Sequence, residues 1–299
     1  MGIEFRPLGE AIAAEVVGVD FARPIDAPSF EAIRQAWFKY NLLVFRDVDI
    51  TPEQQITFSR RFGELQVLAG NEYNLPGYPE ILVISNVKED GKHVGLRGVG
   101  YGWHTDGENR LTTNAGSFLY ALKVPPHGGD TLFANMRAAY NAMSAAIKTR
   151  IRGRRALYSQ VRMHAVYHSH LPPLTPEQVA ERPDVYHPLV ITHPEANSDS
   201  LYIGRWACEV EGMPEQEGRE LIAELQAFTT QPQFTYLHQW RVHDALLWDN
   251  RWTQHCATEF DESQYERHMH RTTPGGGKPY FDDGSGVICS AQVLPTDDN

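Results

Sequence analysis

The chain has little cysteine and no long apolar run. Its three cysteines, Cys208, Cys256 and Cys289, are odd in number, far apart and without Cys-x-x-Cys spacing. We therefore expect neither a disulfide framework nor a thiolate metal site. The longest apolar runs, such as 42–45 and 81–84, are much shorter than the roughly 20 residues of a membrane span. The first residues lack the basic and apolar regions of a signal peptide, which predicts a cytoplasmic protein that does not insert in a membrane.

Basic residues are also scarce. There are 27 Lys+Arg against 38 Asp+Glu, for a formal net charge of -11 among 299 residues. A surface of that sign repels a polyanion, so nucleic acid is not an expected partner. With 41% hydrophobic and 22% charged residues, the composition is that of a globular protein. We find no repeat or low-complexity linker, and expect a single domain over residues 1–299, with a polar tail from about residue 275 and a possible homo-oligomer.

Helical and extended patterns succeed one another along the chain. The helical periodicity covers residues 29–40, 52–62 after the candidate N-cap Thr51, 137–151 and 214–228. Short apolar or β-branched runs, which predict strands, lie at 42–45, 80–85, 117–122, 131–133, 189–192, 201–203 and 246–248. This order predicts a mainly β fold with flanking helices, a double-stranded β-helix (jelly roll), rather than a doubly wound sheet.

The 13 histidines are the most informative residues, because imidazole is the commonest metal ligand. The pattern His-x-Asp/Glu places both side chains on one face of a strand, where they can hold one ion. It occurs at 104–106 and at 193–195, about as often as chance predicts. The second match precedes a turn-rich stretch and reads as a surface hairpin. His104 and Asp106 follow a glycine-rich approach and are the better candidates.

The best third ligand is His255, which follows an apolar run and a polar turn. Two histidines and one carboxylate on one face of an ion leave three positions open, as in non-haem iron(II) oxygenases. From the spacing alone, ordinary hydrogen-bonded histidines fit equally well.

Beyond these residues, the chain resembles the taurine and 2,4-dichlorophenoxyacetate dioxygenase family of Fe(II)/2-oxoglutarate enzymes. The resemblance runs from about Phe5 to Pro274. It is carried, in the family's order, by Trp103–Asp106, Pro125–Thr131 with Phe133–Tyr140, Trp248–Arg251 with His255, and Arg267–Arg271. The segments 136–140 and 201–205 are most similar to its aryloxyalkanoate-type branch.

The resemblance implies a role for each matching residue. It implies that iron is bound by His104, Asp106 and His255. It implies that Thr131 and Arg267 bind 2-oxoglutarate, and that Arg271 faces the acidic group of the primary substrate, since a guanidinium holds a carboxylate through two hydrogen bonds. Loops that carry substrate contacts in the family contain Tyr73, Asn74 and Arg97. An insertion at about 158–186 is a possible lid.

The implied activity is hydroxylation of a small anionic organic acid, with or without its cleavage, using Fe(II), 2-oxoglutarate and O2 and releasing succinate and CO2. Asp106 stands where related halogenases have a small residue, which favours hydroxylation over halogenation. Gly100 departs from the Lys or Asn of better-known relatives, which argues against taurine or simple phenoxyacetate as substrate. Desaturation or oxidative decarboxylation in natural-product biosynthesis, and a non-catalytic anion-binding protein braced by zinc or nickel, are the alternatives.

Overall fold

The computed structural model describes residues 2–67, 72–167 and 172–294. The α-helices of this part of the chain are α1 Ala27–Tyr40, α2 Pro52–Arg60, α3 Met136–Ala142, α4 Ala145–Ile151, α5 Gln160–Tyr167, α6 Pro176–Ala180 and α7 Glu215–Thr229, with a 3-10 helix at Pro232–Phe234. The strands are β1 Glu4–Pro7, β2 Ala14–Val17, β3 Leu42–Phe45, β4 Asn74–Leu75, β5 Tyr78–Ser85, β6 Lys88–Glu89, β7 Lys92–His93, β8 Gly116–Lys123, β9 Thr131–Asn135, β10 Arg155–Tyr158, β11 Val185–Pro188, β12 Val190–Thr192, β13 Asp199–Leu201, β14 Ala207–Val210, β15 Thr235–His238, β16 Ala245–Asp249, β17 Thr253–Ala257, β18 His268–Thr272, β19 Tyr280–Asp282, β20 Ile288–Ser290 and β21 Gln292–Val293.

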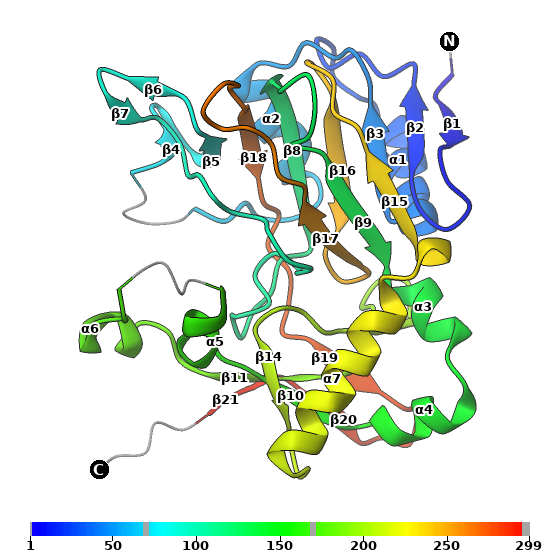
Figure 1. Ribbon diagram of the computed structural model, residues 1–299. Coiled ribbons are helices and arrows are strands. Elements are labelled where there is room, and N and C mark those ends of the chain that lie inside the picture. The colour runs from blue at the N-terminus through cyan, green and yellow to red at the C-terminus, as the bar shows by residue number, and fades with distance from the viewer. Residues whose placement is uncertain (1, 68–71, 168–171, 295–299) are drawn as a thin grey trace.

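Two sheets form the upper half of the molecule in Figure 1. The larger has eight strands in the order β1-β2-β3-β16-β8-β18-β5-β4, and the smaller has the order β15-β9-β17. Apolar side chains of both sheets share one buried cluster, in which Phe133 of β9 meets Leu119, Trp248 and Met269 of the large sheet. The sheets therefore pack face to face, as two apolar sheet faces must if both are to leave water.

Helices α1 and α2 cover the other face of the large sheet. Ile33 and Trp37 of α1 and Phe58 of α2 are buried in one cluster with Phe45 and Phe118. Both helices start where the sequence provides a cap, at Asp26 and at Thr51. A side-chain oxygen at this position satisfies a backbone N–H that has no partner within the helix.

A second group of short strands lies with α3, α4 and α7 in the lower half of Figure 1. Strands β14, β10, β11 and β21 form one sheet, and β12 pairs with β13. Their core contains Tyr158, Leu201 and Leu221. The polar stretch after residue 275 contains β19, β20 and β21, and Phe281 of β19 is buried in the same core.

The predicted helices are confirmed in place, with one correction. The stretch 137–151 is two helices, because Met143 adopts an extended ψ of 147° and Ser144 caps α4 by accepting from Ile147 N. A serine at this position offers its own hydroxyl to the backbone and so starts a new helix instead of continuing the old one. Each of the seven predicted strands overlaps an observed one.

Among the described helices, none combines the length and the apolar character needed to cross a bilayer. The expected lid region at 158–186 contains α5 and α6, and its residues 168–171 lie outside the described part of the chain.

Candidate active site

The first feature of the site is a two-way backbone contact between two distant segments. His104 N donates to His255 O at 3.0 Å, and His255 N donates to His104 O at 2.8 Å. His255 lies on β17, whereas His104 belongs to the loop that follows the glycine-rich segment 98–102. This isolated antiparallel bridge places two imidazoles side by side although 151 positions separate them in the sequence.

Asp106 completes a cluster with the two histidines. Its Oδ1 lies 4.0 Å from His104 Nε2 and 4.0 Å from His255 Nε2. The ligand atoms of the three residues all lie within 4.8 Å of one another, and all three residues are buried. Two imidazole nitrogens and one carboxylate at this separation can hold a divalent transition metal on one face.

The protonation states suit metal binding. His104 Nδ1 lies 2.9 Å from Gly102 O, and because a carbonyl only accepts, Nδ1 carries the proton and Nε2 presents its lone pair. Burial lowers the pKa of His255 to about 4 and that of His104 well below its ordinary value. Burial alone raises the pKa of Asp106, but the Arg271 guanidinium, the two histidines and the hydrogen bond from Ser117 together outweigh burial, so the pKa lies below its ordinary value. At neutral pH the cluster is therefore two neutral imidazoles and a carboxylate.

A chain of hydrogen bonds orients the Asp106 carboxylate. Ser117 Oγ donates to Asp106 Oδ2 at 2.7 Å, Asn250 Nδ2 donates to Ser117 Oγ at 3.0 Å, and Trp248 Nε1 donates to Asn250 Oδ1 at 2.9 Å. The other carboxylate oxygen of Asp106, Oδ1, accepts a hydrogen bond from Arg271 Nη1 at 2.9 Å. Such outer partners fix the orientation of a metal ligand.

One cavity of about 220 Å³ joins the cluster to the other candidate residues. Its lining includes Thr131 on β9, Arg271 on β18 and Arg267 directly before β18. Arg267 and Arg271 are four positions apart and both face this cavity, as the alternation of a strand requires. The remaining lining is partly apolar, with Leu119 and Trp248 among its residues.

The hydroxyl of Thr131 and the guanidinium of Arg267 are held in place. Trp240 Nε1 donates to Thr131 Oγ1 at 3.0 Å, which leaves the Thr131 proton available to an acceptor in the cavity. Arg267 Nε donates to Gly129 O at 3.2 Å. Burial lowers the pKa of Arg267 to about 10, so it stays charged at neutral pH. Gly128 has a φ of 73°, and a Cβ there would overlap the carbonyl oxygen of Glu259, which explains why this turn uses glycine.

The weaker candidates lie around this cavity. Asn74 lines an adjoining polar pocket of about 170 Å³ together with Asp106 and Arg271. The exposed Arg97 lines a smaller pocket with Arg267. Tyr73 precedes Asn74 and is half-buried.

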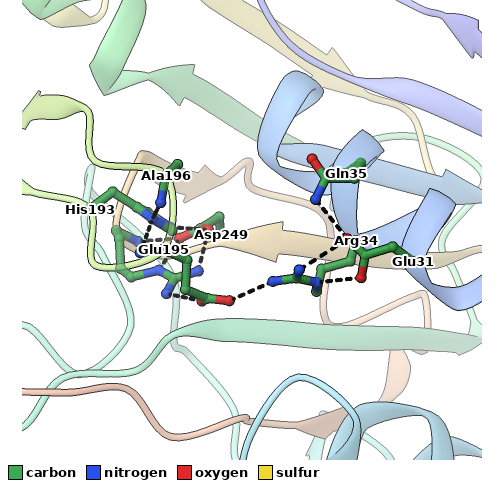
Figure 2. Close-up of polar contacts among 8 residues, drawn as sticks. Glu31, Arg34, Gln35, His193, Glu195, Ala196 and Asp249 are labelled. Carbon is green, nitrogen blue, oxygen red and sulfur yellow. Dashed lines mark hydrogen bonds and ion pairs between the residues drawn. The ribbon is translucent and has the colours of Figure 1, made fainter.

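His193 and Glu195 lie in the hairpin between β12 and β13, as predicted, but His193 is fully buried rather than on the surface. Its Nε2 lies 3.1 Å from Asp249 Oδ2 (Figure 2), and Glu195 accepts from Arg34 and Arg251. This second His-x-Glu pair therefore belongs to an ion-pair network.

Sequence reasoning missed two groups beside the cluster. Ser117 was assigned only to a strand. Glu108 is 1% exposed and accepts from the backbone N–H of Thr105 and of Trp206, which ties the His104–Asp106 turn to the loop after β13. Its burial raises its pKa to about 7. The signal available in the sequence is a second acidic residue two positions after Asp106.

Comparison with known proteins agrees with the geometry of the site. The family model described as "Taurine catabolism dioxygenase TauD, TfdA family" matches residues 4–273. The alpha-ketoglutarate-dependent 2,4-dichlorophenoxyacetate dioxygenase of Cupriavidus pinatubonensis is 34% identical over 286 residues, which cover 91% of this chain and 98% of that protein. The (S)-phenoxypropionate/alpha-ketoglutarate-dioxygenase of Sphingobium herbicidovorans is 34% identical over 285 residues, covering 91% and 95%.

Solved structures agree. A taurine dioxygenase from Burkholderia xenovorans superposes with a TM-score of 0.82 at 29% identity, covering 100% of this chain and 96% of that one. AAD-2 in complex with Mn(II) and N-oxalylglycine gives a TM-score of 0.79 at 33% identity, covering 93% and 99%. The donor set of His104, Asp106 and His255 suits the Fe(II) that such dioxygenases use with 2-oxoglutarate and O2. The chain belongs to the TauD, TfdA family and is a 2-oxoglutarate-dependent dioxygenase.

Proposed function

We propose that the chain hydroxylates an unactivated C–H bond of a small organic acid while 2-oxoglutarate is converted to succinate and CO2. The observation that carries the proposal is the pair of arginines, Arg267 and Arg271, in one cavity with the His104, Asp106 and His255 cluster. One guanidinium is available for the co-substrate and one for the primary substrate.

In this proposal each side chain has a defined task. His104, Asp106 and His255 hold Fe(II), which when bound supplies the activation of O2. Arg267 pairs with the distal carboxylate of 2-oxoglutarate, and the free proton of Thr131 donates to the same molecule. The apolar side chains at the cavity wall keep stray water from the reacting carbon.

Arg271 binds the acidic group of the primary substrate. Because it already contacts Asp106, binding of an anion to Arg271 is felt directly at the metal site. Asn74 borders the same end of the cavity and contributes to substrate binding in this scheme, together with the nearby Tyr73 and Arg97.

We also propose that the two facing sheets form a double-stranded β-helix (jelly roll) and that the whole chain is one domain. The shared core between the β9 sheet and the large sheet supports this. Helix α5, whose residue Gln160 lines the cavity, supports a covering role for the 158–186 region.

The test is anaerobic binding of Fe(II) and 2-oxoglutarate, followed by the weak visible charge-transfer band of the chelate. We expect a band in the wild type and neither band nor turnover in Asp106→Ala, which removes a ligand atom but little core volume. Glu195→Ala is the matched control, because it removes the carboxylate of the other His-x-Asp/Glu pair and should leave the band unchanged. A band of wild-type strength in Asp106→Ala would refute the metal assignment.

The two arginines are separated by a second measurement. Arg267→Gln should raise the 2-oxoglutarate concentration needed for half-maximal turnover by about tenfold or more, as expected for a lost charge-assisted pair. Its effect on the primary substrate should be smaller, and Arg271→Gln should show the opposite preference. Equal effects of both variants on both substrates would contradict the assigned roles.

A further inference from the structure

Arg205 is a third arginine at the candidate active site. It lies in the loop between β13 and β14 and lines the cavity that contains His104, Asp106 and His255. It also lines a second cavity of about 450 Å³, which lies between α5, α7 and β14. Arg205 therefore stands at the border between the two cavities.

The Arg205 side chain is held in a defined position. Its Nη1 donates to Tyr101 O at 2.7 Å, and its guanidinium carbon lies 4.7 Å from the Trp206 ring centroid and 5.9 Å from that of Tyr167. A Cβ on Gly102, which has a φ of 77°, would lie 3.9 Å from Arg205 Cδ, so the side chain runs along the segment that leads to His104. Contacts with aromatic faces and a carbonyl orient the guanidinium before any ligand binds.

The charge of Arg205 has no carboxylate partner. Within the described residues it forms no ion pair, and its Nε is buried without a hydrogen-bond partner. The other two arginines of the second cavity are paired, Arg162 with Glu209 and Arg219 with Glu215. A half-buried guanidinium that is oriented but unpaired is a ready site for an anion.

Buried Glu108 is a nearby carboxylate: burial raises its pKa and the charge of Arg205 acts against that shift, but no ion pair joins it to Arg205 within the described residues. The two Glu108 oxygens accept from the backbone N–H of Thr105 and of Trp206. The Arg205 guanidinium therefore stays open to an anion in the cavity that it shares with the metal cluster.

We propose that Arg205 is a specificity-determining residue that binds a second acidic group of the primary substrate, so that the preferred substrate is a dianion. This rests on the proposed function, in which Arg267 takes 2-oxoglutarate and Arg271 takes the first acidic group. The second cavity, lined by Trp103, Met163 and Ile222, accommodates an apolar part of the molecule beside Arg205.

The test compares matched acids that differ in one carboxylate: phenoxyacetate with 4-carboxyphenoxyacetate, and hexanoate with adipate. Each is titrated anaerobically into the wild-type Fe(II) complex at saturating 2-oxoglutarate, and the shift of the charge-transfer band gives the Kd. We expect a dianion to bind about tenfold or more tightly than its monoanion partner, the scale of one hydrogen bond to a charged group. Arg205→Gln should remove this preference and change monoanion binding little, whereas Arg205→Lys should keep part of it.

Arg219→Gln is the matched control, since it removes a guanidinium from the same cavity that is already paired and exposed. It should keep the preference for dianions. The proposal is overturned if the wild type does not prefer a dianion, if a dicarboxylate only abolishes the band by displacing 2-oxoglutarate, or if Arg205→Gln retains the preference. Absence of the band in wild type with Fe(II) and 2-oxoglutarate would instead overturn the proposed function.

Discussion

Burial sets the charge of single residues in this molecule, at the metal cluster and also far from it. His187 on β11 is fully buried between the rings of Tyr158 and Tyr202, whose centroids lie 4.9 Å and 5.5 Å away. Neither of its ring nitrogens has a hydrogen bond of normal geometry within the described residues, although the backbone of Glu108 and Arg110 lies near enough to favour the protonated ring. Burial lowers its pKa to about 4, from an ordinary 6.5. His187 is therefore a neutral core side chain, in the same protonation state as the metal-site imidazoles but with a purely structural effect.

The buried, neutral His187 predicts how the free energy of unfolding depends on pH. Between pH 6.5 and about pH 4 the unfolded chain binds a proton on His187 and the folded chain does not. The stabilisation is thus complete above pH 6.5 and is lost as pH falls, by up to about 1.4 kcal/mol per pH unit. We expect His187→Phe to flatten the fall of the unfolding free energy in this window, as measured by denaturant titration at several pH values. An unchanged slope in His187→Phe would contradict the argument.

Secondary-structure elements differ in how much their local stability contributes to the stability of the whole fold. Helices α2 and α6 both begin with a capping box, at Thr51 with Gln54 and at Thr175 with Gln178. Helix α2 buries Ile56 and Phe58 against the large sheet, whereas α6 has five residues and none of them is buried. The same capping box therefore stabilises a helix that packs on the core in α2 and a helix that does not in α6.

We expect Thr51→Ala to lower the free energy of unfolding by about 1 kcal/mol, because it removes an N-cap from a packed helix. Thr175→Ala removes an equivalent cap from α6 and should change global stability much less, since α6 can fray without exposing core. Denaturant unfolding followed by circular dichroism measures both. Equal losses in the two variants would show that the caps act independently of packing.

The difference between local signals and contacts formed by the fold explains which features the sequence could predict. Capping residues and apolar periodicity are local, and they located α1, α2 and α7. The metal cluster was found from two short patterns and a family resemblance. By contrast, β18 has no apolar run, and its strand character is predicted only from the arginines that the family resemblance places there. Ser117 and Glu108 each have a partner near in sequence, Asp106 and Thr105, but also depend on Asn250 and Trp206, which lie 133 and 98 positions away. No local pattern encodes these distant contacts.

At the scale of the whole molecule, one partly buried ionic network joins parts that are distant in sequence (Figure 2). Asp249, at the end of β16, accepts from Arg251 at 2.8 Å and 2.7 Å and lies 3.1 Å from His193 of the β12–β13 hairpin. Arg251 continues to Glu195, and Glu195 to Arg34 on α1. The network thus ties the large sheet and its helix to the second group of strands, directly beside the turn that carries Asn250.

Asp249 should therefore be far more important for stability than its neighbours in the network. Burial alone raises its pKa, but Arg251 and His193 together outweigh burial and hold the pKa below its ordinary value, so the carboxylate is charged in the fold. Asp249→Asn leaves Arg251, whose side chain is 9% exposed, without its main counter-charge, and we expect a loss of about 3–5 kcal/mol in unfolding free energy.

Glu195→Gln is the control for this loss. Its side chain is 43% exposed, so water replaces much of what the carboxylate provides and the loss should be at most about 1 kcal/mol. Thermal and denaturant unfolding of both variants, with the Fe(II)/2-oxoglutarate band as a second measurement, check the comparison. A weaker band in Asp249→Asn would indicate that the network also keeps the Asn250–Ser117–Asp106 chain aligned. Losses of similar size in the two variants would contradict the argument that burial makes the Asp249–Arg251 pair matter more than the exposed carboxylate of Glu195.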